Sequence, residues 1–304
     1  MSRPDPENVK RIACVGAGTI GGGWATYFLS RGFDVVATDP GADAQATLEH
    51  FVDFAWPKVQ ELGINSGAAK ERLTFTSDLS EAVADADFIQ ESAPDYEDLK
   101  IGLFEKIGAA ARPETVIASS SSVYLPTRLA SNCTNPERCI IGHPFTPSYI
   151  VPLVEVVGGE KTSDEVMDWS MSFYNGIGKK ALRLKKEIES YVSNRLQHVV
   201  AQEAASLVEA GICDYDDIDV AVSYGPGLRW AFAGPAMCSH LGGGKGGLKH
   251  MIEHFGWSYS DEAKDNLFDS VERMAKGRDI EELEDWRDKN LLNQLKHVRM
   301  TGDY

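Results

Sequence analysis

The sequence predicts an α/β fold in two parts, a doubly wound parallel sheet over residues 1–188 and an all-α region over residues 189–304. Short β-type runs alternate with helix-like stretches in the first part, which is typical of a parallel sheet covered on both faces. The second part has helical periodicity and no convincing strand pattern. A chain of 304 residues is near the roughly 250 to 300 residues at which single cores stop growing, so its length allows one or two domains.

The elements of the first part follow from their apolar patterns. An apolar run at residues 11–15 ends in glycines, and apolar residues at helical spacing follow at residues 24–29, which predicts a strand, a tight turn and a helix. Two later β-type runs, at residues 153–157 and 180–184, have no clean crossover pattern and can extend the same sheet. The other strands are expected at residues 33–38, 73–75, 87–90, 115–118 and 139–142, and helices at residues 42–62, 97–111 and 124–131.

The second part begins with a long amphipathic helix. Apolar side chains recur at helical spacing over residues 192–210, and Gly211 stands where a helix C-cap is expected. A further helical packing surface is indicated by a group of apolar residues near the end of the sequence, Leu283, Trp286, Leu291, Leu292 and Leu295.

Composition and charge exclude several classes of partner. The chain has 46 acidic and 30 basic residues and a formal charge of −16, so nucleic acid and anionic membranes would be repelled. Its five cysteines form no CxxC pair, which indicates neither a disulfide framework nor a zinc ribbon and favours a reducing, cytoplasmic location. The first ten residues are polar and no run of about 18 apolar residues occurs, so neither secretion nor membrane spanning is expected.

A glycine-rich turn follows the first expected strand. Residues 16–21 read Gly-Ala-Gly-Thr-Ile-Gly, a G-x-G-x-x-G motif between a strand and a helix. Gly16 would form the tight turn, Gly18 would let a pyrophosphate approach the backbone, and Gly21 would let the helix pack on the strand. The free N–H groups at the helix start, including those of Thr19 and Ile20, can bind phosphate without a basic side chain.

Asp39 completes this motif and selects the cofactor. It ends the second expected strand, close to the spacing of about 20 residues typical of a ribose-binding acid. Its carboxylate can accept hydrogen bonds from a ribose diol and would repel a 2′-phosphate, and residues 40–44 contain no Lys or Arg that could offset this. The sequence therefore predicts a Rossmann-type domain that binds NAD in preference to NADP; FAD uses the same motif but does not explain the residues that follow.

Four further motifs occur in a characteristic order. They are Ser119-Ser-Ser-Ser122, Gly142-His-Pro-Phe145, Pro152-Leu-Val-Glu-Val-Val157 and Asn194-Arg-Leu196. In order and approximate spacing they resemble the motifs of the L-3-hydroxyacyl-CoA dehydrogenase superfamily, and the resemblance covers essentially the whole chain. It implies NAD-dependent oxidation of a 3-hydroxyl group by a homodimer.

The chemistry of these residues agrees with the resemblance. Oxidation of a secondary alcohol needs a base for the hydroxyl proton, and His143 follows a β-type run that would place it at the carboxyl end of a strand. Glu155 can orient the imidazole and stabilise the imidazolium. The resemblance implies that His143 is the base, that Glu155 is its partner, and that Ser122 and Asn194 orient the substrate oxygen.

Other polar motifs of the sequence have a structural alternative or lack a defining residue. Glu91 and Lys100 match the segment that lines the nicotinamide ribose in the superfamily, although a solvated salt bridge is the alternative. His250 and His254 are four residues apart, but their segment is not HExxH, so no metal is expected. The glycine-rich segment at residues 242–247 lacks the Lys-Ser/Thr ending of a P-loop.

The substrate expectation comes from the second part of the chain. The chain lacks the Gly-Phe-Tyr type ending of the acyl-CoA enzymes, and residues 227–232 are similar to a segment of superfamily members that oxidise free 3-hydroxy acids. Arg229 could bind a carboxylate bidentately. A quaternary ammonium group would be recognised by aromatic faces, for which the sequence offers Trp230, Phe232, Tyr191 and Phe145.

Four segments favour L-carnitine as that free acid. Residues 55–57, 90–94, 152–161 and 242–250 are more similar to the carnitine-oxidising members than to the λ-crystallin type members that oxidise L-gulonate. L-Gulonate and L-3-hydroxyacyl-CoA remain the alternatives, and a non-catalytic binding protein is a third. Two departures from the superfamily pattern lie near the expected pocket, Thr146 in place of Asn, and Glu189-Ser190-Tyr191 in place of Pro-Gly-Phe.

Overall fold

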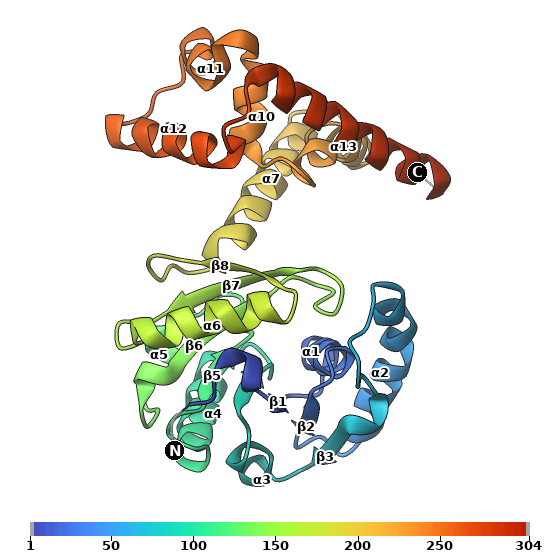
Figure 1. Ribbon diagram of the computed structural model, residues 1–304, viewed down its shortest axis with the longest axis vertical. Helices are drawn as coiled ribbons and strands as arrows, with labels where there is room; N and C mark the ends of the chain where they lie inside the picture. The colour runs from blue at the N-terminus through green and yellow to red at the C-terminus, as the bar shows by residue number, and fades with distance from the viewer. Residues whose placement is uncertain (1–2, 302–304) are drawn as a thin grey trace. The chain divides into compact units, whose positions relative to one another are not determined.

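The computed structural model describes residues 3–301 and divides into two compact units. The first unit ends at His198 and the second begins at Val199 (Figure 1). The division falls inside a long helix, α7, which spans Tyr191–Glu209. The domain boundary near residue 188 stays a prediction.

The first unit is built on one eight-stranded sheet. Its strand order is β3-β2-β1-β4-β5-β6-β7-β8, and every neighbouring pair is parallel except β6 and β7. This confirms the α/β, Rossmann-type class. The strands are β1 (Arg11–Val15), β2 (Asp34–Thr38), β3 (Leu73–Thr76), β4 (Phe88–Glu91), β5 (Val116–Ser119), β6 (Cys139–Pro144), β7 (Leu153–Gly158) and β8 (Lys180–Arg183).

Helices cover both faces of this sheet. Alternate residues of a strand point to opposite faces, so Ile12 of β1 packs in one apolar cluster and Ala13 in the other. Side chains of α1 (Thr19–Ser30), α2 (Ala44–Glu61) and α6 (Asp164–Gly176) belong to the first cluster. Side chains of α3 (Leu79–Ala84), α4 (Glu97–Ala110) and α5 (Pro126–Leu129) belong to the second. Short 3-10 turns lie at Pro6–Asn8 (η1), Lys70–Arg72 (η2) and Pro136–Arg138 (η3).

Strands β6 and β7 depart from the expected all-parallel sheet. Residues 145–152 connect them, and this is shorter than the dozen or so residues that a parallel crossover needs. The chain therefore returns antiparallel, with His143 directly opposite Glu155. Helix α6 then provides the crossover that makes β8 parallel to β7. Neither α6 nor α3 was among the helices expected from the sequence.

The second unit is helical throughout its described part. Helices α10, α11, α12 and α13 contribute to one apolar cluster, which includes Met237, Leu248, Val271 and Leu283. Leu283 and Trp286 thus pack within their own unit, whereas Leu292 is exposed. After α7 the elements are α8 (Tyr215–Tyr224), α9 (Pro226–Trp230), α10 (Pro235–Gly242), η4 (Gly244–Gly246), α11 (Gly247–Phe255), α12 (Asp261–Ala275) and α13 (Ile280–Thr301). Within residues 3–301, no helix combines the length and apolarity needed to cross a bilayer.

Candidate active site

The predicted cofactor and catalytic residues of the first unit gather at one edge of its sheet. Gly16 follows β1, Asp39 follows β2, Glu91 ends β4 and Ser119 ends β5. The carboxyl ends of parallel strands meet at this edge, which is where ligands bind in open α/β sheets. His143 lies near the carboxyl end of β6 and joins them.

The centre of the predicted catalytic group is a buried histidine–carboxylate pair. His143 Nδ1 lies 2.8 Å from Glu155 Oε2, and their side chains are 7% and 0% exposed. Because a carboxylate accepts hydrogen bonds, this contact favours the tautomer with the proton on Nδ1 and leaves Nε2 able to accept a proton. No described residue forms a hydrogen bond with Nε2 in the structure.

The other oxygen of Glu155 is held by the start of α7. Glu155 Oε1 accepts hydrogen bonds from Val192 N at 3.0 Å, Ser193 N at 2.9 Å and Ser193 Oγ at 3.0 Å. Burial alone would raise the pKa of Glu155, but the hydrogen bonds from His143 and Ser193 outweigh it and lower the pKa below its ordinary value. The carboxylate is therefore ionised at neutral pH.

Aromatic residues pack around the imidazole. The ring centroids of Phe145 and Tyr191 lie 6.0 and 5.2 Å from that of His143. Tyr191 is fully buried, and its hydroxyl donates to Tyr124 O at 2.7 Å. Tyr191 thus supports the imidazole from the protein interior, while Phe145 is half-buried.

Ser122 and Asn194 are brought together, along with a carboxylate that the sequence reasoning missed. Asn194 Nδ2 donates to Ser122 O at 3.3 Å, and Ser122 Oγ donates to Asp95 Oδ2 at 2.9 Å. Asp95 also accepts from Ser121 Oγ at 2.7 Å and lies 3.9 Å from Lys100 Nζ. Nothing in the sequence pattern distinguishes Asp95 from the other acids of its segment; its position at the end of an extended loop after β4 is the only available signal.

Glu91 and Lys100 form a buried ion pair. Lys100 Nζ donates to the two carboxylate oxygens of Glu91 at 2.8 and 3.0 Å, and the side chains are 1% and 0% exposed. Lys100 also donates to Ala93 O at 3.0 Å, and Glu91 accepts from Ala93 N at 2.6 Å. The pair therefore fixes the loop after β4, and it is not a solvated surface contact.

The glycine turn has the stereochemistry that a dinucleotide requires. Gly16 has φ +102°, and a Cβ on Gly21 would lie 1.9 Å from Gly16 O, so neither position accepts a side chain. A Cβ on Gly18 would meet no atom within 4 Å, which leaves the start of α1 open to a ligand. Asp39 accepts from Ala17 N at 2.9 Å and from Gly41 N at 2.8 Å, so its carboxylate is oriented at the turn.

A cavity connects this turn with the predicted catalytic serine. Its volume is about 340 Å³, and it reaches from Gly18, Thr19, Ile20 and Asp39 to Ser122. Lys100 and the loop at residues 92–95 line it as well. Free amides for a pyrophosphate and a carboxylate for a ribose lie on one wall, so these residues fit a dinucleotide.

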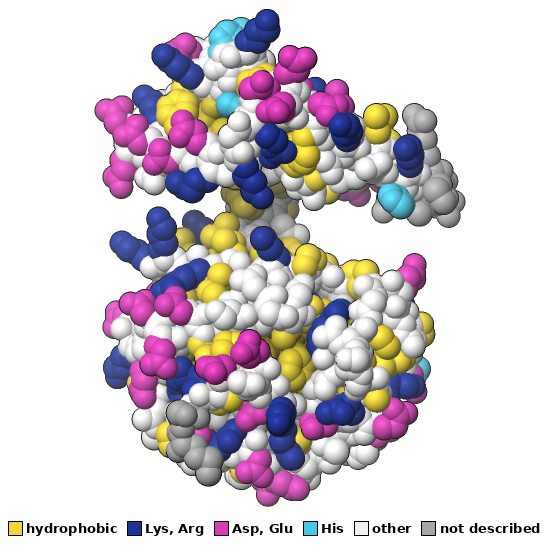
Figure 2. Space-filling view, in the orientation of Figure 1, with side chains coloured by type: hydrophobic (Ala, Val, Ile, Leu, Met, Phe, Trp, Pro, Cys, Tyr) yellow, Lys and Arg dark blue, Asp and Glu magenta, His cyan; other side chains and the backbone are white. Residues whose placement is uncertain are grey.

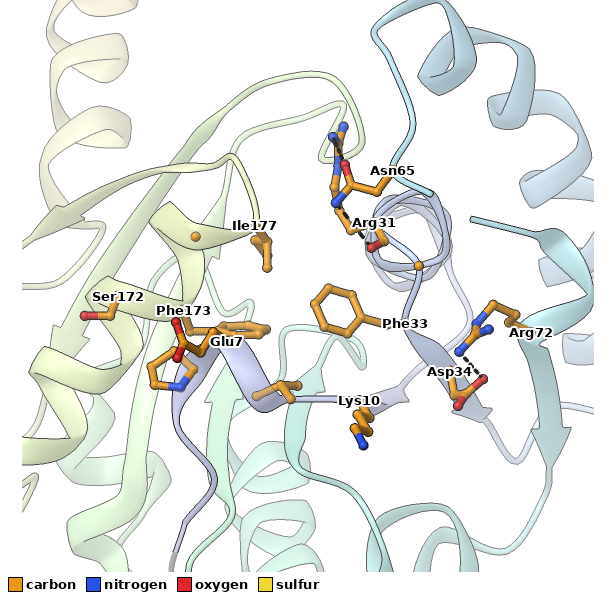
Figure 3. Close-up of a pocket in the computed structure, with 14 residues that line it drawn as sticks. Glu7, Lys10, Arg31, Phe33, Asp34, Asn65, Arg72, Ser172, Phe173 and Ile177 are labelled. Carbon is orange, nitrogen blue, oxygen red and sulfur yellow. Dashed lines mark hydrogen bonds and ion pairs between the residues drawn. The ribbon is translucent and has the colours of Figure 1, made fainter. Parts of the chain in front are cut away.

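A larger cavity lies elsewhere in the first unit (Figure 3). It measures about 650 Å³ and is lined by Lys10, Arg31, Phe33, Arg72 and Phe173, among others. These residues lie beside the amino ends of β1 and β2 and at the end of α6, and none is a predicted site residue. The chemistry of the side chains, and not cavity size, locates the candidate site. Within residues 3–301, no group of three or more His, Cys, Asp or Glu side chains is placed to hold a metal ion.

The predicted substrate residues Arg229, Trp230 and Phe232 belong to the second unit. Arg229 lines a cavity of about 60 Å³ together with Phe232 and Arg287. Phe232 packs edge-on against Trp286 with ring centroids 5.4 Å apart, whereas Trp230 is 42% exposed. Their contact with a substrate stays a prediction.

Comparison with known proteins places these features in context. Residues 11–188 match the family model described as "3-hydroxyacyl-CoA dehydrogenase, NAD binding domain", and residues 191–279 match "3-hydroxyacyl-CoA dehydrogenase, C-terminal domain". The L-carnitine dehydrogenase of Streptomyces coelicolor is 44% identical, over 98% of this chain and 97% of that protein. The L-carnitine dehydrogenase of Pseudomonas aeruginosa is 41% identical, over 96% of this chain and 95% of that protein.

Solved structures show the same architecture. A 5-formyl-3-hydroxy-2-methylpyridine 4-carboxylic acid 5-dehydrogenase, described as an NAD+-dependent dismutase, is 25% identical with a TM-score of 0.76. That match covers 97% of this chain and all of the other. A 3-hydroxybutyryl-CoA dehydrogenase from Escherichia coli is 25% identical with a TM-score of 0.65, over 83% of this chain and 54% of that chain.

Proposed function

Because the chain belongs to the 3-hydroxyacyl-CoA dehydrogenase family and is an NAD-dependent oxidoreductase acting on 3-hydroxy groups, we propose that it oxidises L-carnitine to 3-dehydrocarnitine. The observation that carries the chemistry is the buried His143–Glu155 pair at the sheet edge that also bears the glycine turn. The choice of substrate is supported by near full-length identities of 44% and 41% to two L-carnitine dehydrogenases.

In this proposal, the site residues remove the hydroxyl proton and orient the substrate. His143 Nε2 accepts the proton of the 3-hydroxyl group, and Glu155 stabilises the imidazolium that results. Ser122 and Asn194 hold the substrate oxygen in line with Nε2. When bound, NAD+ supplies the acceptor for the hydride that leaves C3. Asp39 and the start of α1 bind the dinucleotide through its ribose and pyrophosphate.

Substrate selection rests on the two charged ends of L-carnitine. Arg229 binds the carboxylate, since a guanidinium matches its geometry bidentately. The trimethylammonium group cannot donate a hydrogen bond and is held by aromatic faces. Phe145 of the first unit is half-buried and Trp230 of the second is exposed, so each ring offers accessible surface, whereas Tyr191 is fully buried and the partly buried Phe232 packs edge-on against Trp286.

Parallel assays of NADH formation test this proposal. The purified protein is given NAD+ with L-carnitine, L-gulonate or L-3-hydroxybutyryl-CoA, and kcat/KM is compared. We expect the highest value with L-carnitine. A higher value with either alternative would overturn the substrate assignment but leave the chemistry intact. Tight NADH binding without turnover of any of the three compounds would instead favour a binding protein.

We also propose that the protein is a homodimer. Val192, Leu196 and Val199 recur on α7 and are 41%, 59% and 62% exposed, which is an unusual expanse of apolar surface on one helix. A second copy of the chain would bury these side chains. Sedimentation equilibrium at micromolar concentration should give twice the mass of the chain, and a monomer would refute the proposal.

A further inference from the structure

Glu155 is a carboxylate whose charge depends on its hydrogen-bond donors. Its side chain is 0% exposed, and an ionised carboxylate in such a place is costly unless donors compensate it. One oxygen, Oε2, faces His143 Nδ1. The other, Oε1, receives three donors, all from two successive residues at the start of α7.

Two of these donors belong to the backbone. The first N–H groups of a helix have no partner within the helix, and its amino end favours negative charge. Ser190 and Tyr191 both have positive φ, +61° and +49°, immediately before Val192 and Ser193. This bend in the chain brings the amides of Val192 and Ser193 onto Glu155 Oε1.

The third donor is a side chain. Ser193 Oγ lies 3.0 Å from Glu155 Oε1, and it is the only one of the three donors that a substitution can remove while the backbone stays in place. Ser193 has no place in the motifs that identify the catalytic residues. Its hydroxyl lies on the far side of the carboxylate from His143, so it acts on the imidazole only through Glu155.

We propose that Ser193 is a positioning residue for the reaction. With Oε1 occupied by three donors, the carboxylate cannot rotate, and Oε2 stays directed at His143 Nδ1. This keeps the imidazole in the orientation and tautomer in which Nε2 can accept the substrate proton. The inference rests on the proposed role of His143 as the base.

The expected effect of removing the Ser193 hydroxyl follows from how the negative charge of Glu155 is shared between its two oxygens. A hydroxyl that donates to Oε1 disperses the charge of Glu155, so less of it remains at Oε2. Removal of the hydroxyl should therefore strengthen the stabilisation of the His143 imidazolium and raise the pH at which the base becomes neutral. With only the two backbone amides left on Oε1, the carboxylate is held less firmly, which should lower kcat. The KM for the hydroxy acid should stay the same, because the hydroxyl of Ser193 is engaged with Glu155.

The test compares Ser193→Ala with Ser193→Thr, which keeps a hydroxyl, and with Ser206→Ala, a matched change at an exposed position of the same helix. The pH dependence of kcat/KM and kcat is measured for each. For Ser193→Ala we expect an acid limb displaced upward by roughly half a pH unit and a several-fold lower kcat. Ser193→Thr and Ser206→Ala should follow the wild-type profile.

An NMR titration of His143 in the protein without cofactor separates this inference from the proposed function. It should show the same upward displacement in Ser193→Ala, even if none of the three substrates is turned over. Superimposable acid limbs and titration curves would overturn the positioning role, even if kcat or stability fell. A Ser193→Thr profile that matches Ser193→Ala would overturn it as well, because a hydroxyl would then be present without effect.

Discussion

The relation between His143 and Glu155 depends on strand register. Directly opposed residues on antiparallel strands have side chains about 5 Å apart, so two positions separated along the chain become neighbours. A shift of register by one residue would place Glu155 on the other face of the sheet. The contact between His143 and Glu155 is therefore set by the backbone register of β6 and β7.

Replacement of the base gives the first prediction. His143→Asn should lower kcat by about 10²- to 10⁴-fold, the usual contribution of a positioned general base, because Asn cannot accept the hydroxyl proton. NADH affinity, measured by fluorescence titration, should stay unchanged. His50→Asn, at an exposed position of α2, is the control. A His143→Asn enzyme with normal turnover would contradict the role of His143.

Replacement of Glu155 tests whether its negative charge stabilises the folded protein. The pKa of Glu155 is lowered from its ordinary 4.5, so its ionised form stabilises the fold above that pH, and the contribution is lost as pH falls through the lowered value. Urea unfolding should show Glu155→Gln less stable than the wild type at neutral pH, with the difference narrowing below about pH 4.5. A difference that stays constant or widens in acid would contradict the lowered pKa.

At the residue scale, the sequence predicted the catalytic candidates better than their supports. His143 and Glu155 lie in recognisable motifs, and the structure places them in contact. Asp95 and Ser193 were missed because a carboxylate or a hydroxyl in a loop or at a helix start has no periodic signature. Their contacts with Ser122 and Glu155 depend on how distant loops fold together, which spacing along the chain does not report.

At the element scale, substitutions at two glycines of the turn should affect folding and cofactor binding separately. Gly21→Ala would place a Cβ 1.9 Å from Gly16 O and force α1 away from β1, so it should destabilise the protein by about 1–3 kcal/mol or more. Gly18→Ala meets no atom within 4 Å, so it should fold normally but weaken NADH binding by about tenfold or more, because the methyl group occupies the phosphate approach.

Thermal unfolding and NADH titration distinguish the two variants. Gly18→Ala should keep the wild-type Tm, and Gly21→Ala should not. Equal loss of Tm in both variants would contradict the assignment of Gly18 to the cofactor. Normal NADH affinity of a folded Gly18→Ala protein would contradict it too.

Elements with strong apolar runs were predicted correctly, and weaker ones were not. The eight β-type runs all form strands. The central strands are buried and need continuous apolar sequence, whereas β3 and β8 at the sheet edges are more exposed. Helix α3 was missed because residues 79–84 are too few for a clear period. Helix α6 was missed although Val166, Met167 and Phe173 recur at helical spacing on its buried face, so its sequence did carry a readable period. Antiparallel β7 follows from the short connection at residues 145–152, which a prediction based on alternation alone overlooks.

At the scale of the whole molecule, the charge of −16 must coexist with an anionic cofactor. Figure 2 shows acidic and basic side chains interspersed on the visible surface of each unit, with no broad basic face. At the proposed cofactor site, the positive field is instead assigned to backbone amides at the start of α1. In this proposal the net charge acts on partners and long-range attraction, and the amides act on the cofactor locally.

Binding of NAD+ by backbone amides in an acidic protein predicts how the KM for NAD+ changes with salt. Added salt screens the repulsion between the acidic protein and NAD+, so the KM for NAD+ should stay the same or fall between low salt and about 0.3 M NaCl. Steady-state kinetics at fixed hydroxy acid concentration check this. A KM for NAD+ that rises steeply with salt would indicate a basic binding site and contradict the assignment to backbone amides.

The central claim is hydride transfer from C3 of L-carnitine to NAD+, and isotope transfer tests it most directly. The protein is incubated with NAD+ and L-carnitine deuterated at C3, and the reduced cofactor is analysed by mass spectrometry. The predicted result is NADH that carries one deuterium per molecule, formed with a primary isotope effect when the chemical step limits turnover. Reduced cofactor without deuterium, or none formed while unlabelled L-carnitine is also inert, would contradict the claim.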